Sequence, residues 1–230
     1  MRIVILGANG PTGRLLTGQA LAAGHRVVAM TRRPAEFPLR DSSLDVVGGD
    51  VLDQGAVDSV VEGSDAVLST LGAPFGKEPV EVYSRGVEHT LEAMKRYGVP
   101  RLAVVSSGAV TGEDEPTGGF LFNRVLQPYV TRVIGKTVYD DMRRMEALVT
   151  SSDTDWTILR PSGLYDLPKV TEFSLTEGHG PGRFTSRADL AAAMVLQLSD
   201  ARFVRKVAHV ITTEDNPSLF SMIWREARKK

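Results

Sequence analysis

Three glycines at equal spacing, Gly7, Gly10 and Gly13, follow an apolar segment near the start of the chain. In a turn from a buried strand into a helix, one glycine allows the bend, a second lets the backbone approach a pyrophosphate, and a third lets the helix pack closely on the strand. The free N–H groups and the positive end of the helix dipole then form an anion site. The pattern predicts a diphosphate-binding turn made of Gly7, Asn9, Gly10, Pro11, Thr12 and Gly13.

The elements around this turn have the order that a dinucleotide-binding motif requires. Residues 3–6 predict a strand buried on both faces, residues 12–23 a helix, and residues 26–31 a second strand. Pro11 suits the first helical position, where its missing N–H costs little. The alternative is an ordinary strand-to-helix turn whose glycines only allow tight packing.

Two arginines, Arg32 and Arg33, directly follow the second strand, and neither neighbour of this pair is an acid. An NAD site usually places an acid here for the ribose 2′-hydroxyl, whereas an NADP site places arginine here for the 2′-phosphate. The sequence therefore predicts NADP(H) as the cofactor. The alternative is a solvated basic pair in a loop.

Asp50 and Val51 come at the end of a third predicted strand, residues 45–51. There Asp50 would accept a hydrogen bond from the adenine amino group while Val51 packs on the ring. The alternative is that Asp50 only caps the helix predicted over residues 54–62. Where the chain leaves the fourth strand, the backbone would approach the middle of the cofactor at Leu71, Gly72 and Ala73.

Ser106 and Ser107 lie at the carboxyl end of a strand predicted over residues 101–108. Ligands of open α/β sheets bind beyond the carboxyl ends of the strands, so these hydroxyls are placed to contact nicotinamide, ribose or substrate. We predict Ser106 as a cofactor contact and Ser107 as the catalytic residue. The alternative is that both satisfy backbone groups at the strand end. Pro161, just after the strand at residues 156–159, is a further predicted cofactor contact.

The composition excludes several function classes. The chain has 230 residues, a formal net charge of −1 and no cysteine. The absence of cysteine rules out disulfides, a thiolate nucleophile and cysteine-bound metal, and we expect no metal site. The near-neutral charge argues against nucleic-acid or membrane partners. No signal-peptide pattern and no apolar run of about 18 residues are present, so we expect a cytoplasmic monomer or homodimer.

Strands and helices alternate along the chain, which is typical of an α/β fold with a doubly wound parallel sheet, the Rossmann fold. We expect a single domain over residues 1–230, in which residues 161–186 and 203–230 contribute a small C-terminal substrate-side lobe. Residues 120–134 could form a lid, a packing insert or an oligomer contact. The predicted strands are 3–6, 26–31, 45–51, 65–73, 101–108, 156–159 and 207–211, and the predicted helices are 12–23, 54–62, 80–97, 136–149, 186–198 and 217–228.

Several short segments together resemble the atypical short-chain dehydrogenase/reductase group, which includes NmrA-like regulators. Within it the chain is most similar to the biliverdin-IXβ reductase/flavin reductase branch, over about residues 3–198. Residues 113–137 make a longer stretch than in that branch. The group resemblance lies in segments 7–13, 49–52, 65–67, 71–72 and 156–161, and the branch resemblance in 47–52, 140–141, 178–183 and 186–190.

The resemblance bears on proton transfer. Many short-chain dehydrogenases use a Tyr-x-x-x-Lys pair, and Tyr139 and Arg143 have that spacing with arginine in place of lysine. When Glu146 is aligned with the family's glutamate, however, the tyrosine position falls on Val138 and the lysine position on Met142. The usual pair is then absent, as in the flavin/biliverdin reductases, and the proton would come from solvent.

These features predict an NADPH-dependent oxidoreductase that transfers a hydride to a flat conjugated acceptor. Free flavin, a quinone and a tetrapyrrole are the candidate acceptors. An alternative is a redox-sensing protein that binds NADP(H) without catalysis and reports to a partner. A third hypothesis is a nucleotide-sugar epimerase or dehydratase, which would need the acid/base pair.

Overall fold

The computed structural model describes residues 1–111, 135–178 and 182–215. Its centre is an eight-stranded sheet in the order β3-β2-β1-β4-β5-β6-β10-β8. All neighbours in this sheet are parallel except β8, which runs antiparallel to β10. The strands are β1 (Arg2–Leu6), β2 (Arg26–Thr31), β3 (Leu44–Gly48), β4 (Ala66–Ser69), β5 (Arg101–Val105), β6 (Asp155–Pro161), β8 (Phe173–Thr176) and β10 (Lys206–Thr212).

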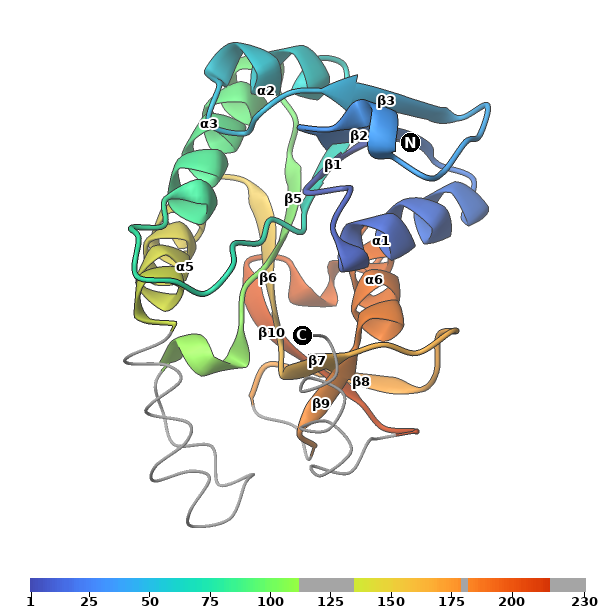
Figure 1. The fold of residues 1–230 in the computed structure, drawn as a ribbon, viewed down its shortest axis with the longest axis vertical. Helices are drawn as coiled ribbons and strands as arrows, with labels where there is room; N and C mark the ends of the chain where they lie inside the picture. Colours follow the sequence, from blue (N-terminus) through green and yellow to red (C-terminus); the bar gives the residue numbers. More distant parts are fainter. Residues whose placement is uncertain (112–134, 179–181, 216–230) are drawn as a thin grey trace.

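Helices cover both faces of this sheet, as Figure 1 shows. One face carries α1 and α6, which pack on each other, and the other carries α2, α3 and α5. The predicted doubly wound parallel sheet is therefore confirmed. The helices are α1 (Pro11–Ala22), α2 (Gln54–Val61), α3 (Val82–Tyr97), α5 (Lys136–Thr150) and α6 (Arg187–Leu196), with short 3-10 turns at Pro34–Glu36, Gly108–Thr111 and Ala201–Phe203.

The first strand shows why the sheet is buried on both sides. Ile3 and Ile5 belong to the apolar cluster under α1 and α6, whereas Val4 and Leu6 belong to the cluster under the other helices. All four side chains are fully buried. Alternation of side chains along a strand therefore supplies two cores from one continuous apolar run, as is typical of parallel sheets.

The crossover connections leave β1 and β4 toward opposite faces of the sheet. In such folds a crevice opens outside the carboxyl ends of the strands where the winding reverses. The turns after β1 and β4 and the end of β5 therefore meet at one edge. Among the described residues, no helix combines the length and the apolar character needed to cross a bilayer.

A second, two-stranded parallel sheet lies beside this edge. It pairs β7 (Gly163–Tyr165) with β9 (Phe184–Ser186). Together with β8 it falls inside the segment expected to form a substrate-side lobe, and the division of the chain into these parts stays a prediction. The segments predicted at 120–134 and 217–228 lie outside the described residues.

Two predicted capping arrangements need correction. Asp50 does not cap α2, because Asp53 accepts from the backbone N–H groups of Gly55 and Ala56. Asp50 instead accepts from the N–H of Leu52 at 3.0 Å. β3 also ends at Gly48 rather than at residue 51, so the acid lies in the turn beyond the strand.

At α6 only half of the predicted capping box forms. Ser186 accepts from the N–H of Asp189 at 3.0 Å, as expected. The Asp189 carboxylate does not return to Ser186 and instead accepts from Thr212 Oγ1 at 2.6 Å and from the N–H and hydroxyl of Thr171 at 2.7 and 2.9 Å. This fully buried acid therefore ties α6 to the end of β10 and to the segment before β8.

We expect Asp189→Asn to lower the free energy of unfolding by about 1–3 kcal/mol, because a buried amide cannot accept from all three donors. Urea unfolding at neutral pH measures this. Asp45→Asn, an exposed acid on the edge strand β3, is the matched control and should change stability by less than about 0.5 kcal/mol. Equal stability of Asp189→Asn and the control would contradict the role assigned to this network.

Candidate functional site

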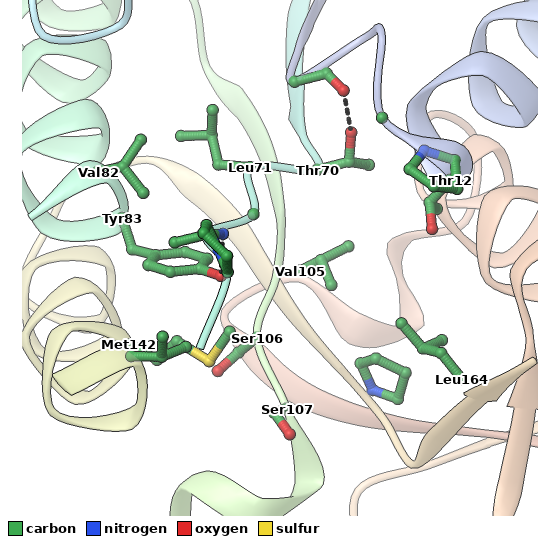
Figure 2. A pocket seen from close by; sticks show the side chains of 18 of the residues that line it. Thr12, Thr70, Leu71, Val82, Tyr83, Val105, Ser106, Ser107, Met142 and Leu164 are labelled. Carbon is green, nitrogen blue, oxygen red and sulfur yellow. Dashed lines mark hydrogen bonds between the residues drawn. The ribbon is translucent and has the colours of Figure 1, made fainter. Parts of the chain in front are cut away.

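A cavity of about 1170 Å³ runs along the carboxyl edge of the sheet. Figure 2 shows its middle, where Ser106 and Ser107, which directly follow β5, lie between Tyr83 and Met142 on one side and Leu164 on the other. The volume exceeds the range of about 300–1,000 Å³ typical of small-molecule pockets. Of the predicted site residues, all but Gly13 line it: Gly7, Asn9, Gly10, Pro11, Thr12, Arg32, Arg33, Asp50, Val51, Leu71, Gly72, Ala73, Ser106, Ser107 and Pro161.

The glycine turn is closely packed at two of the three glycines, as the sequence predicted. Gly7 has a φ of +74°, and a Cβ there would lie 2.7 Å from the carbonyl oxygen of Thr70. A Cβ at Gly13 would lie 2.3 Å from the carbonyl oxygen of Gly7. Gly13 therefore serves the packing of α1 on β1, which explains why it is buried beneath the cavity rather than exposed in it.

The N-terminus of α1 is open to the cavity. Its N-cap residue, Gly10, offers no side-chain hydrogen bond to the first turn. Beside it, Asn9 Oδ1 accepts from Arg14 Nε at 2.9 Å, which holds a cationic side chain at the same turn. Free N–H groups, the helix dipole and Arg14 together favour an anion here. Arg14 lines the cavity, and it was not among the site residues predicted from the sequence.

The two arginines after β2 differ in their surroundings. Arg33 forms an ion pair with Glu36 at 3.1 Å, and both side chains are largely exposed. Arg32 is exposed and forms no hydrogen bond or ion pair with the residues that the structure describes. Both line the cavity together with Glu36, an acid that lies just beyond the pair. Neither guanidinium is committed to the protein core, so both can meet a phosphate.

A chain of hydrogen bonds connects α5 to the segment after β4. The fully buried carboxylate of Asp141 accepts from the N–H of Tyr83 at 2.9 Å and from the hydroxyl of Ser84, at the start of α3. The Tyr83 hydroxyl in turn accepts from the N–H of Ala73 at 3.0 Å. Arg144 pairs with Asp141 at 3.1 Å. This arrangement explains why α3 begins at Val82 rather than at residue 80, and it fixes the backbone predicted to contact the cofactor.

We expect Asp141→Asn to weaken NADP⁺ binding by about tenfold. Without the carboxylate, the start of α3 and the Tyr83 side chain would shift, and the Ala73 backbone would move with them by a fraction of an ångström. Calorimetric titration measures this dissociation constant. Tyr83→Phe, which removes only the acceptor for Ala73, should show the same direction.

The neighbouring acid provides the control. Asp140 forms partly exposed ion pairs with Lys136 and Arg143, which lower its pKa below the usual value. Since exposed ion pairs contribute little to the stability of a fold, Asp140→Asn should leave NADP⁺ affinity within about twofold of wild type. Equal effects of the two substitutions would contradict the positioning role of Asp141.

The two serines at the end of β5 have different partners. Ser107 Oγ accepts from the N–H of Ala109 at 3.2 Å, which supports the backbone-satisfying alternative in part. Ser106 donates its N–H to Leu159, but its buried hydroxyl has no hydrogen-bond partner among the described residues. A buried polar atom without a partner is costly, so a ligand that reaches Ser106 would satisfy it. The hydroxyl fits the polar end of a nicotinamide ribose or amide.

Tyr139 enters the site next to Ser107. Its side chain is 8% exposed and lines the cavity together with Ser107. Burial raises the pKa of Tyr139 above the usual value of a tyrosine, and the interaction with the Ser107 hydroxyl offsets part of this rise. The phenol is therefore protonated at neutral pH. The family alignment placed the tyrosine position on Val138, one residue away, and so missed this contact.

Arg143 does not act as the lysine of a Tyr–Lys pair. Its guanidinium donates to the carbonyl of Val110 at 3.0 Å and to Asp140 at 2.5 Å. Among the described residues it forms no hydrogen bond to Tyr139 that would lower the tyrosine pKa. Val138 and Met142, the residues at the aligned positions, line the cavity with apolar surface.

An ion pair below the site fixes α5 on the sheet. Arg160 of β6 donates to both carboxylate oxygens of Glu146, at 3.0 and 2.5 Å, and both side chains are mostly buried. Bidentate pairs of this kind are strong and directional. The ion pair therefore fixes the position of α5, which carries Tyr139, relative to β6, which ends at Pro161.

The fold and the cavity together define a dinucleotide-binding protein. An uncapped helix N-terminus, a glycine turn without room for side chains and exposed arginines lie in one crevice. A family model described as NAD(P)H-binding matches residues 7–201. The chain therefore belongs to this NAD(P)H-binding family, and the predicted atypical short-chain dehydrogenase/reductase membership is confirmed. The predicted NADP(H) cofactor is confirmed at the level of the family.

Curated relatives include proteins without a known function and reductases. An uncharacterised protein of Mycobacterium tuberculosis is 36% identical over 47% of this chain and 12% of its own length. The (4-alkanoyl-5-oxo-2,5-dihydrofuran-3-yl)methyl phosphate reductase of Streptomyces griseus is 30% identical over 69% of this chain and 46% of its own. The chain thus spans less than half the length of these relatives.

Solved structures support the fold. A short-chain dehydrogenase/reductase of Veillonella parvula, determined in complex with NADP, is similar with a TM-score of 0.74 and 20% identity, over 95% of this chain and 99% of that one. The anaerobillin reductase ChuY of Escherichia coli O157:H7 has a TM-score of 0.72 and 19% identity, over 95% and 100%. At these identities the likeness concerns the backbone arrangement.

Proposed function

We propose that this chain is an NADPH-dependent reductase that transfers a hydride to a flat conjugated acceptor such as a flavin, a quinone or a tetrapyrrole. The observation that carries the proposal is that Tyr139, a protonated phenol, lines the dinucleotide crevice together with Ser107 at the end of β5. The reductases among its relatives support the same reaction class.

NADPH, when bound, supplies the hydride from its nicotinamide C4. In our proposal the α1 N-terminus with Gly7, Gly10 and Thr12 holds the pyrophosphate, and Arg32 and Arg33 hold the 2′-phosphate. Asp50 and Val51 contact adenine, Leu71 to Ala73 line the middle of the cofactor, and Pro161 and Ser106 orient the nicotinamide.

The proton follows a separate route. Tyr139 donates its phenolic proton to the acceptor as the acceptor gains the hydride, so the acceptor is reduced by two electrons and gains two hydrogens. Ser107 holds the phenol in place, and the phenolate then takes a proton from solvent. This assigns the proton to a side chain rather than to solvent alone, in contrast to the expectation from the sequence.

Two further cations favour an acidic substituent on the acceptor. Arg183 and Arg187 also line the cavity, and Arg187 forms an ion pair with Asp166 at 2.8 Å. A phosphate or carboxylate on the acceptor would interact favourably with them. FMN and a carboxylated tetrapyrrole are therefore better candidates than neutral riboflavin.

The test follows the loss of NADPH absorbance with FMN, riboflavin, menadione and biliverdin as acceptors. Turnover with at least one of them supports the proposal. NADPH binding without any turnover would contradict it and favour the redox-sensor alternative, for which the missing lysine beside Tyr139 is the supporting observation. The expected monomer or homodimer and the cytoplasmic location stay proposals, to be tested by light scattering and by fractionation.

We expect Tyr139→Phe to lower kcat by about 100-fold, the lower end of the range for general acid catalysis. The active form is the neutral phenol, and burial raises its pKa above the usual value of a tyrosine. Wild-type kcat should therefore be flat through neutral pH and fall only at strongly alkaline pH as the proton is lost. That alkaline limb should be absent in Tyr139→Phe. If kcat and its pH profile were both unchanged in Tyr139→Phe, the proton donor would be solvent and not Tyr139.

We expect the double substitution Arg32→Ala with Arg33→Ala to raise KM for NADPH by about 10- to 100-fold, since each bond to the 2′-phosphate is charge-assisted. KM for NADH should change little, because NADH has no 2′-phosphate. Arg26→Ala, an exposed arginine at the opposite end of β2, is the control. Equal losses with both cofactors would contradict the assigned role of the pair.

A further inference from the structure

One aromatic ring at the mouth of the cavity is half-exposed. Phe75 lies in the segment between β4 and α3 and is 52% exposed while it lines the cavity. The other large exposed apolar side chains of the described residues are aliphatic: Met1, Leu52, Val170 and Leu196. Burial of a large aromatic ring is favourable, and the exposed ring of Phe75 does not gain this stabilisation from the protein itself. The open face of Phe75 is therefore available to a ligand.

The position of Phe75 is set from both sides. Before it, the N–H of Ala73 donates to the Tyr83 hydroxyl at 3.0 Å, and after it the carbonyl of Gly76 accepts from Thr137 Oγ1 at 3.2 Å. Tyr83 belongs to α3 and Thr137 to α5, so two helices hold the short segment that carries the ring. Pro74, which precedes Phe75, removes further backbone freedom.

The ring also lies beside the proposed reaction centre. Its centroid is 5.9 Å from the centroid of the Tyr139 ring, with an angle of 41° between the ring planes. Tyr139 in turn contacts Ser107 at the end of β5. A planar acceptor that receives a proton from Tyr139 must therefore pass within reach of the Phe75 ring.

We propose that Phe75 is the residue that selects extended planar acceptors, by stacking on the acceptor ring while Tyr139 contacts its polar edge. The inference rests on the proposed reductase function and adds a preference for acceptors with an extended ring system. A three-ring flavin overlaps with Phe75, whereas a one-ring quinone that reaches Tyr139 leaves most of the Phe75 ring uncovered. Offset stacking of this kind favours binding beyond what the buried area alone provides.

The experiment compares riboflavin with p-benzoquinone in wild type, Phe75→Ala, Phe75→Leu and Phe75→Tyr. For Phe75→Ala we expect KM for riboflavin to rise about tenfold, with KM for p-benzoquinone within about twofold and kcat little changed. Phe75→Leu keeps the apolar volume without the ring and should resemble Phe75→Ala. Phe75→Tyr restores the ring and should resemble wild type. Val170→Ala, an exposed apolar residue outside the cavity, is the control.

A second readout does not depend on turnover. Riboflavin fluorescence, titrated with protein saturated with NADP⁺, gives a dissociation constant that should rise about tenfold in Phe75→Ala and remain near wild type in Phe75→Tyr. Equal KM changes for the two acceptors, or riboflavin binding that is insensitive to Phe75, would overturn this inference alone. Absence of turnover with any acceptor in wild type would overturn the proposed function, whereas absence of riboflavin binding together with turnover of another acceptor would overturn this inference alone.

Discussion

The close approach of α1 to β1 is the constraint on which the rest of the structure depends. Gly7 and Gly13 have no space for a Cβ, because the carbonyl groups of the turn and of Thr70 occupy it. This contact brings the uncapped end of α1 to the edge of the sheet and places it beside the end of β4. The predicted anion site would lie at this end of α1, in the wall of the cavity.

The other half of the site depends on α5. Asp141 joins this helix to the start of α3, and Glu146 joins it to β6 through Arg160. In the N-terminal half of the same helix, Val138, Tyr139 and Met142 line the cavity. The acceptor wall and the cofactor segment at Ala73 therefore share one rigid support, so the two ligands would be aligned by the same helix.

Local patterns predicted the fold and the crevice well. The glycine turn, the arginine pair and the strand ends at Ser106 and Ser107 are short-range signals, and the sheet brings them together by topology. The buried networks were not predictable, because Asp141 and Tyr83 are 58 residues apart in sequence. The same holds for Asp189, whose spacing suggested a local cap but whose partners lie in other elements. The sequence analysis noted the spacing of Tyr139 and Arg143 but set it aside in favour of Val138, yet both Val138 and Tyr139 line the cavity because neighbouring helix positions can face the same space.

The ion pair of Arg33 with Glu36 has a consequence for how the cofactors would be distinguished. Before a dinucleotide arrives, this guanidinium already has an anionic partner. A doubly charged phosphate outcompetes a carboxylate for arginine, whereas a neutral ribose hydroxyl does not. In the proposed complex a 2′-phosphate would replace the Glu36 carboxylate as the partner of Arg33, whereas NADH would leave this ion pair intact.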